Sequence, residues 1–240
     1  MKTEPTPFSV VLAAGLGQRL LPATRTLPKP LIVARGRPCI DWILASLLKA
    51  GTKRNYVVVG HLAHVIRRHL REPHFASSGV QFAEQSRQTG TASAIACCEP
   101  LLREDSRSEG PMIVTAADYI VPEDFFSLLL ERYRSQKPDV LIATRRLPAC
   151  SARSKNVVLT RSDGTVSAIL EKPATLPDGI VLSAPLIFVA PKELVRQCCA
   201  TQPSIRGEME VQETLNAMIQ NGWRALTFET EQVEDLESLA

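Results

Sequence analysis

The chain has 240 residues, which is enough for one α/β domain with a full core and short for two. Its composition, 45% hydrophobic and 22% charged with a net charge of +3, is typical of a globular protein. The basic residues are scattered, which argues against a nucleic-acid partner, and no apolar run reaches the roughly 20 residues that a membrane span needs.

Strand and helix signals alternate through the first 145 residues, the pattern of a sheet wound with helices. Apolar runs bounded by turn residues predict strands, and apolar residues at helical spacing predict helices. The predicted strands cover residues 8–14, 55–60, 80–83, 111–116 and 140–144. The predicted helices cover residues 38–50, 63–70, 91–98 and 122–134, and the polar run 103–110 is predicted to be a loop.

The pattern changes after residue 145, where strand signals follow one another across Asp-Gly turns. We predict strands over 156–160, 165–170, 180–189 and 223–228, and helices over 191–200, 208–221 and 233–239. The fold class is therefore α/β: a Rossmann-like wound mixed sheet flanked by helices, with a small β-rich flap. We expect residues 1–240 to form a single domain with two halves, 1–145 and 146–240.

Cysteine and histidine usage indicates a reducing compartment, the cytoplasm, and ordinary surface histidines. None of the six cysteines forms a C-x-x-C pair, and all but Cys150 lie in segments with helical character. The four histidines lie between residues 61 and 74, but their spacing is not that of a metal site on a helix. The N-terminus, MKTEPTPF, has none of the features of a signal peptide.

The stretch 10–31 carries the strongest functional signal. A buried strand runs into a loop containing Gly15 and Gly17, and the cations Arg19 and Lys29 follow. Glycine adds no Cβ and reaches positive φ, so backbone N–H groups can approach anionic oxygens closely. The two cations supply the full positive charge that a triphosphate requires. The stretch therefore predicts a phosphate-binding loop at the end of the first strand.

Two common glycine-loop motifs do not fit this stretch. The third glycine of a G-x-G-x-x-G dinucleotide motif is Leu20 here, and no G-x-x-x-x-G-K-[ST] run occurs in the chain. The stretch instead resembles the L-A-A-G-x-G-x-R…P-K-P-L signature of the sugar-1-phosphate nucleotidyltransferases, or nucleotide-sugar pyrophosphorylases. Gln18 stands where that family usually has Thr. The matching residues are Leu12, Ala13, Ala14, Gly15, Gly17, Arg19, Pro28, Lys29, Pro30 and Leu31.

The loop 84–92 carries a second group of candidate residues. A Gln side chain offers a donor and an acceptor together, so Gln85 can pair with the edge of a pyrimidine, and Gly90 lets the backbone approach a flat base. This segment is similar to the family's Q-x-x-x-x-G base-reading segment. Gly90 and Thr91, with the Ala-Ala-Gly of the first motif, resemble the uridylyl/thymidylyltransferase branch and its uridylyl members in particular.

Two acids are candidate ligands of a Mg²⁺ ion, which favours carboxylate and phosphate oxygens. Asp118 follows the strand 111–116, at the edge where an open α/β sheet binds its ligand. The resemblance implies that Asp118 is the metal-binding Asp of the family's Gly-Asp motif, and that Ala117 stands in the position of its Gly. It also implies a second acid late in the chain, and counting back from the Glu-Asp-Leu run at 234–236 places Glu229 there.

The tripeptide Glu171-Lys172-Pro173 matches the family's E-K-P motif at the end of a strand. The resemblance implies that Glu171 accepts hydrogen bonds from sugar hydroxyls and that Lys172 pairs with the sugar phosphate, roles that suit an acid beside a cation. Asn156 stands where the family often has Gly, and Ser183-Ala184-Pro185 replaces the usual Asn-Ala-Gly that contacts the sugar. These departures allow for an acceptor substrate that is an unusual sugar phosphate or a polyol phosphate.

The resemblance implies a Mg²⁺-dependent nucleotidyltransferase of a single domain, in which 1–145 binds the nucleotide and 146–240 the sugar phosphate. An NTP, with UTP favoured, and a sugar 1-phosphate would give an NDP-sugar and pyrophosphate. A phosphate oxygen of the sugar would attack the α-phosphorus in line, with Arg19, Lys29 and Lys172 as the catalytic cations.

Three other functions are weighed against this one. The first is a dTTP- or GTP-specific enzyme acting on glucose or mannose 1-phosphate. The second is a non-catalytic regulatory subunit that binds a nucleotide-sugar. The third, a glycosyltransferase on a related fold, is disfavoured because it would more often carry an Asp-x-Asp motif, which this chain lacks. The sequence leaves the oligomeric state open, a homo-oligomer included.

Overall fold

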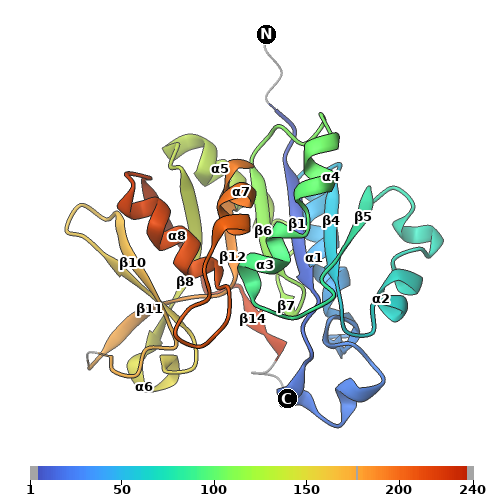
Figure 1. The fold of residues 1–240 in the computed structure, drawn as a ribbon, viewed down its shortest axis with the longest axis horizontal. Helices are drawn as coiled ribbons and strands as arrows, with labels where there is room; N and C mark the ends of the chain where they lie inside the picture. The colour runs from blue at the N-terminus through green and yellow to red at the C-terminus, as the bar shows by residue number, and fades with distance from the viewer. Residues whose placement is uncertain (1–4, 177, 237–240) are drawn as a thin grey trace.

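A computed structural model describes residues 5–176 and 178–236 and contains a ten-stranded mixed sheet with helices on both faces (Figure 1). Its strands are β1 (Phe8–Ala13), β4 (Asn55–Val59), β5 (Val80–Glu84), β6 (Met112–Ala116), β8 (Val140–Pro148), β9 (Asn156–Thr160), β10 (Val166–Glu171), β11 (Ile180–Ala184), β12 (Ile187–Ala190) and β13 (Ala225–Glu229). Two short pairs lie outside this sheet: β2 (Val33–Ala34) with β3 (Arg37–Pro38), and β7 (Tyr119–Ile120) with β14 (Glu234–Asp235).

The helices follow the strands as the alternating pattern predicts. They are α1 (Cys39–Lys49), α2 (Ala63–His69), α3 (Thr91–Ala96), α4 (Glu99–Glu104), α5 (Phe125–Gln136), α6 (Ala149–Ala152), α7 (Glu193–Ala200) and α8 (Val211–Gln220). The short 3₁₀ turns η1 (Gln18–Leu20), η2 (Ala23–Arg25) and η3 (Lys29–Leu31) follow β1, and η4 (Pro73–Phe75) follows α2. In the described ranges, no helix has the length and apolarity that crossing a membrane would require.

The sheet has a parallel part and an antiparallel part. Its order is β10-β9-β11-β8-β12-β6-β1-β4-β5, with β13 also paired to β8. β1 runs parallel to β4 and β6, and β4 parallel to β5, so the carboxyl ends of these strands share one edge of the sheet. β11 runs antiparallel to β8 and β9, and β9 antiparallel to β10. The predicted class, a wound mixed sheet with a β-rich flap, is confirmed.

Both faces of the central strands are buried, which explains their unbroken apolar runs. Phe8 and Val10 of β1 pack with the helices α3, α7 and α8, which cover the face turned toward the viewer in Figure 1. Val11 and Ala13, on the opposite face of the same strand, pack with α1 and α5. The two-residue period of the strand thus divides one apolar segment between two cores.

The predicted strand 180–189 is two strands. Pro185 separates β11 from β12 because proline has no N–H to continue a ladder. β11 pairs with β9 and with the second half of β8, whereas β12 pairs with β6 and with Ile142 and Leu141 of β8. The chain therefore changes partners at Pro185.

Three further boundaries differ from the prediction. The helix expected over 233–239 is absent from its described part, where Glu234 and Asp235 form β14 against β7; residues 237–239 lie outside the described residues. The helix expected over 91–98 ends at Ala96 as α3, and a second helix, α4, begins at Glu99 with Pro100, which has no backbone donor, in its first turn. As a result, α4 occupies the start of the predicted loop 103–110, and Cys97 and Cys98 lie at the turn, whereas Cys150 lies in α6.

Candidate active site

Two neighbouring cavities open where β1, β5 and β6 end. The larger cavity, of about 540 Å³, is bounded by the loop after β1 and the loop between β5 and α3. The smaller cavity, of about 190 Å³, lies against the ends of β8, β9, β10 and β11. Three charged residues, Arg19, Lys29 and Asp118, line both cavities, so these residues mark the junction of one extended site.

The structure brings nearly all of the predicted site residues into these cavities. The larger cavity contains every residue predicted to bind the nucleotide: Leu12, Ala13, Ala14, Gly15, Gly17, Gln85, Gly90 and Thr91. The smaller cavity contains the residues predicted to bind the sugar phosphate: Asn156, Glu171, Lys172 and Ser183.

The loop after β1 contains two glycines with different roles: Gly17 is required by the packing of the loop, whereas Gly15 has open space beside it. Gly17 has φ +64°, and a Cβ there would lie 2.8 Å from Cγ2 of Thr24, whose hydroxyl donates to the Gly17 carbonyl at 2.9 Å. Position 17 therefore requires glycine for the fold itself. A Cβ at Gly15 would meet no protein atom within 4 Å. Protein packing does not demand glycine at position 15, but a ligand lying against the backbone would.

Gln85 lies at the end of β5 with its amide held in one orientation. Its Nε2 donates to the Gly90 carbonyl at 3.0 Å and to the Ser93 hydroxyl at 2.7 Å, and Gln88 donates to the Gln85 carbonyl at 3.3 Å. Because both N–H bonds of the amide point into the protein, its Oε1 is the atom left to meet a ligand. The side chain thus presents an acceptor to the larger cavity.

The segment before α8 closes over the loop 84–92. Met209 receives a hydrogen bond from Ala92 N and donates one to the Thr89 carbonyl, both at 2.8 Å. Gly90, at φ +123°, lies so close that a Cβ would come within 2.3 Å of the Met209 carbonyl oxygen. The loop and the segment therefore form one unit that only glycine at position 90 accommodates.

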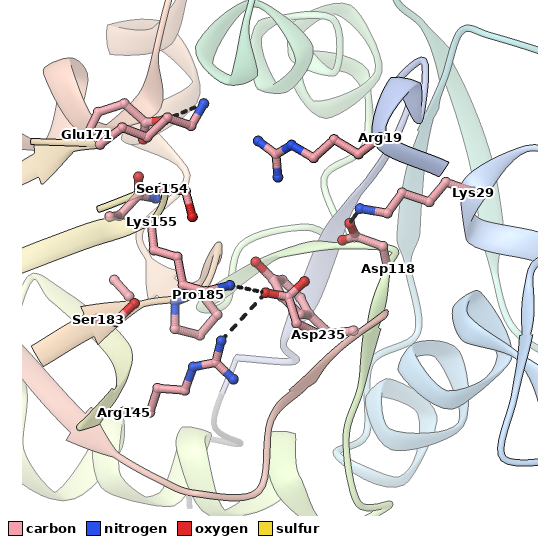
Figure 2. Close-up of a pocket in the computed structure, with 14 residues that line it drawn as sticks. Arg19, Lys29, Asp118, Arg145, Ser154, Lys155, Glu171, Ser183, Pro185 and Asp235 are labelled. Carbon is pink, nitrogen blue, oxygen red and sulfur yellow. Dashed lines mark hydrogen bonds and ion pairs between the residues drawn. The ribbon is translucent and has the colours of Figure 1, made fainter. Parts of the chain in front are cut away.

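Lys29 and Asp118 meet at the junction of the two cavities. Lys29 Nζ lies 2.5 Å from Asp118 Oδ2, and the two side chains are 14% and 22% exposed. Asp118 lies in the turn between β6 and β7, where Leu236 N donates to its carbonyl at 3.1 Å. Figure 2 shows Arg19 extending into the open space of the site while Lys29 turns to Asp118.

Strand register aligns the wall of the smaller cavity. Arg145 of β8 faces Ser183 of β11, and Ala184 of β11 faces Asn156 of β9, which in turn faces Glu171 of β10. The four strands β8 to β11 thus deliver polar side chains to one end of the sheet. Asn156 stands where the family often has glycine, and its backbone is not among those with positive φ, so asparagine fits there without strain.

Glu171 is the centre of a charged group at one end of the smaller cavity. Lys172 Nζ and Arg206 Nη1 each lie 3.3 Å from its Oε1, and Arg206 Nη2 lies 2.8 Å from Glu210 Oε1. Burial raises the pKa of Glu210, and the neighbouring charge of Glu171 raises it further. Lys172 has φ +45°, and its N–H donates to the Lys155 carbonyl at 3.2 Å.

Asp235 lies at the other end of the smaller cavity, between two cations. Its Oδ2 lies 2.7 Å from Lys155 Nζ and 3.5 Å from Arg145 Nη2. Figure 2 shows Lys155 and Arg145 reaching this carboxylate from two sides. Asp235 is brought here by the pairing of β14 with β7, which sets it directly opposite Tyr119 and therefore beside Asp118.

The prediction that Glu229 joins Asp118 at a metal is corrected by this placement. Glu229 is an exposed residue at the end of β13 and lines neither cavity. Its two carboxylate oxygens accept from Arg146 Nε at 2.7 Å and Nη2 at 3.1 Å. The late acid that shares a cavity with Asp118 is Asp235, six residues further on, which two cations already engage.

Sequence reasoning missed several cavity residues. Gln88 and Glu208 line the larger cavity; Arg145, Lys155 and Asp235 line the smaller one; and Arg206 contacts Glu171. The run Arg206-Gly207-Glu208 between two helices was a usable signal, because charged residues around a glycine in a loop often meet a ligand. The others depend on strand pairing over long sequence distances, which leaves no local pattern.

The donors at the junction fit a Mg²⁺ ion that takes most of its ligands from substrate. Asp118 offers a carboxylate there, and Mg²⁺ in phosphoryl-transfer sites is usually held by one or two carboxylates together with substrate phosphates and water. Among the described residues, no group of three or more His, Cys, Asp or Glu side chains is arranged to hold an ion.

Two of the four histidines have partners within the protein. His61 Nε2 lies 3.0 Å from the Thr24 carbonyl, and His69 Nε2 lies 2.7 Å from Asp41.

Comparison with known proteins shows which family this chain belongs to. A solved structure of UDP-glucose pyrophosphorylase complexed with UDP-glucose superposes with a TM-score of 0.82 at 17% identity, covering 98% of this chain and 94% of that one, which establishes the shared fold. Residues 8–236 match the nucleotidyl transferase family model. The chain belongs to the nucleotidyl transferase family.

Two curated relatives illustrate its place within the family. A UTP–glucose-1-phosphate uridylyltransferase of Haloferax volcanii is 27% identical over 214 residues, covering 89% of this chain and 84% of that protein. A glucose-1-phosphate adenylyltransferase of Geobacter metallireducens is 31% identical over 180 residues, covering 70% of this chain but 43% of that protein. The chain therefore spans most of the first relative and less than half of the second.

Proposed function

We propose that the protein transfers a nucleotidyl group from an NTP, with UTP favoured, to a sugar 1-phosphate, giving an NDP-sugar and pyrophosphate. The observation that carries the proposal is the junction: a cavity with base-reading groups and a cavity with sugar-reading groups meet at Arg19, Lys29 and Asp118. Two substrates bound in this way would bring their phosphates together at those three charges. The names of the relatives, which describe glucose-1-phosphate nucleotidyltransferases, support the same reaction.

The fixed amide of Gln85 supports uracil as the base. Its Oε1 is an acceptor directed to the ligand side, and the N3–H of uracil or thymine is a donor. Cytosine has an acceptor at that ring position, so it would set two acceptors against each other. The uridylyltransferase relative favours UTP, whereas the adenylyltransferase relative makes ATP the rival to be tested.

The acceptor phosphate is assigned to the smaller cavity. Glu171 is placed to accept hydrogen bonds from hydroxyl groups, while Lys172 and Arg206 offer positive charge beside it. Their pairing with Glu171 holds both cations at the cavity until a phosphate competes for them. This arrangement suits a ligand that carries hydroxyls and a phosphate on the same small ring.

The reaction needs no covalent bond to the protein. An oxygen of the acceptor phosphate attacks the α-phosphorus of the NTP, and the bond from that phosphorus to the oxygen bridging it to the β-phosphorus breaks as pyrophosphate leaves. Arg19 and Lys29 neutralise charge on the α-phosphate and the leaving group, and Lys172 orients the attacking phosphate. Catalysis is thus positioning plus charge stabilisation at the junction.

A Mg²⁺ ion fits this proposal with Asp118 as its protein ligand. When bound, the ion would neutralise phosphate oxygens and orient them for displacement. Lys29 would then exchange its contact with Asp118 for the substrate phosphates.

The six cysteines are free thiols, which supports a reducing compartment such as the cytoplasm.

The test is pyrophosphate release by the full chain with Mg²⁺, crossing UTP, dTTP, GTP, CTP and ATP with a panel of sugar 1-phosphates. Release with UTP and at least one sugar 1-phosphate is expected. Release with dTTP or GTP in place of UTP would refute the base assignment but keep the reaction. Binding of nucleotide or nucleotide-sugar without any release would refute catalysis and support the regulatory subunit.

A further inference from the structure

The smaller cavity carries more positive than negative side chains. Five cationic and three acidic residues line it: Arg19, Lys29, Arg145, Lys155 and Lys172, with Asp118, Glu171 and Asp235. Two of the acids each face a lysine, Lys29 at Asp118 and Lys172 at Glu171. The third acid, Asp235, is shared by two cations at the other end of the cavity.

One carboxylate cannot neutralise both of these cations. Lys155 Nζ and Arg145 Nη2 approach the same oxygen, Oδ2 of Asp235, at 2.7 and 3.5 Å. Arg145 and Asp235 are 15% exposed and Lys155 is 29% exposed, so water screens this excess charge only in part. Among the described residues, Asp235 is the acid within ion-pair distance of these two cations, and a negative group on a ligand would add to its charge.

Of the two cations, Lys155 is the one suited to meet a ligand. Arg145 is held from behind, because its Nη1 donates to the Val233 carbonyl at 3.2 Å. Lys155 is the more exposed side chain, and its ammonium has three donors on a flexible stem. It can therefore keep Asp235 as one partner and turn another N–H toward the cavity.

The position of Lys155 also places it beside the acceptor. It comes directly before Asn156 of β9, and its carbonyl accepts the N–H of Lys172, the residue assigned to the acceptor phosphate. Figure 2 shows the Lys155 side chain running from the Glu171 side of the cavity to Asp235. A hydroxyl needs no full charge for recognition, whereas a lysine and an arginine together match a carboxylate or a phosphate.

We propose that Lys155 is a specificity-determining residue that binds an anionic substituent, a carboxylate or a second phosphate, on the sugar ring of the acceptor. Arg145 and Asp235 position Lys155. The substrate class is thus an acidic sugar 1-phosphate rather than a neutral one. This inference rests on the proposed function and adds to it the chemistry of the acceptor.

The test compares acceptors that differ at one group. With UTP, or whichever nucleotide turns over best, kcat/KM is measured for glucose 1-phosphate, glucuronic acid 1-phosphate and glucose 1,6-bisphosphate. The wild type should prefer one acidic acceptor to glucose 1-phosphate at least tenfold, and which one is preferred separates carboxylate from phosphate. Lys155→Met should lower kcat/KM for that acceptor at least tenfold more than it lowers kcat/KM for glucose 1-phosphate. Lys155→Arg should retain the preference.

A matched control is Lys192→Met, which removes a lysine paired with an acid, Glu109, away from both cavities. A wild type that prefers glucose 1-phosphate would overturn the inference and leave the proposed function standing. Equal loss with all acceptors in Lys155→Met, at an unchanged melting temperature, would also overturn it. If Lys155→Met fails to fold, loss of the preference in Lys155→Arg would count against it in the same way. No turnover with any acceptor would overturn the proposed function and this inference with it.

Discussion

Replacing Lys29 with methionine tests the charge at the junction of the two cavities. Lys29→Met keeps the aliphatic bulk of the side chain and removes its ammonium group, which lies 2.5 Å from Asp118. The variant therefore leaves Asp118 without this partner and the phosphates without one of the three charged groups that line both cavities.

The size of the effect follows from burial. Because the Lys29 side chain is 14% exposed, water replaces its charge poorly. Removing one preorganised donor to developing charge costs about 10²–10³-fold in kcat, or about 2.7–4 kcal/mol. Loss of a partly buried ion pair should cost about 1–2 kcal/mol of unfolding free energy, between the values for surface and buried pairs. That cost corresponds to a melting temperature lower by about 2–8 °C.

Steady-state pyrophosphate release gives kcat and KM, and thermal unfolding gives the melting temperature. We expect kcat of Lys29→Met to fall at least a hundredfold while the variant remains folded at the assay temperature. Lys192→Met should change neither quantity appreciably. A Lys29→Met variant with kcat within threefold of wild type would refute the role of Lys29, and a loss of kcat that only follows unfolding would refute the electrostatic explanation.

Three more predictions concern the base-reading loop and acid stability. Gln85→Leu removes the acceptor offered to the base, so KM for UTP should rise about tenfold and the preference for UTP over CTP should disappear in the same release assay. Gly90→Ala places a Cβ against the Met209 carbonyl at φ +123°, so the melting temperature and kcat/KM for UTP should both fall; unchanged values would contradict the close approach. Hydrogen bonds from Arg107 hold the pKa of Asp105 well below its ordinary value, so the charged form stabilises the fold above about pH 4, and this contribution is lost as the pH falls toward the lowered pKa. The difference in urea unfolding free energy between wild type and Asp105→Asn should therefore be largest at pH 7 and shrink below pH 4; a constant difference would contradict this account.

Local signals predicted which residues line the larger cavity because most of that cavity is built from contiguous segments. Gly17 and Lys29 belong to the loop that one strand enters, and Gln85 and Gly90 belong to the next such loop. Each position follows from the end of a strand and the conformational freedom of glycine, so sequence spacing carries most of the geometry.

The second half was less predictable because its site depends on which strands pair. Asp235 reaches the cavity through the pairing of β14 with β7, across more than 100 residues of sequence, and a helical pattern at 233–239 competed with it. Glu229 ends β13, whose pairing with β8 leaves its side chain near Arg146 instead. Tertiary pairing overrides local propensity in such short segments.

The most direct test of the central claim follows the α-phosphate itself. The protein is incubated with Mg²⁺, UTP carrying ³²P at the α-position, and the acceptor sugar 1-phosphate that performs best, and the products are separated by ion-exchange chromatography. The account predicts that the label appears in a UDP-sugar and that the pyrophosphate is unlabelled. Label found only as UMP or UDP, or left in UTP for every acceptor, would contradict the claim that this site joins a nucleotide to a sugar phosphate.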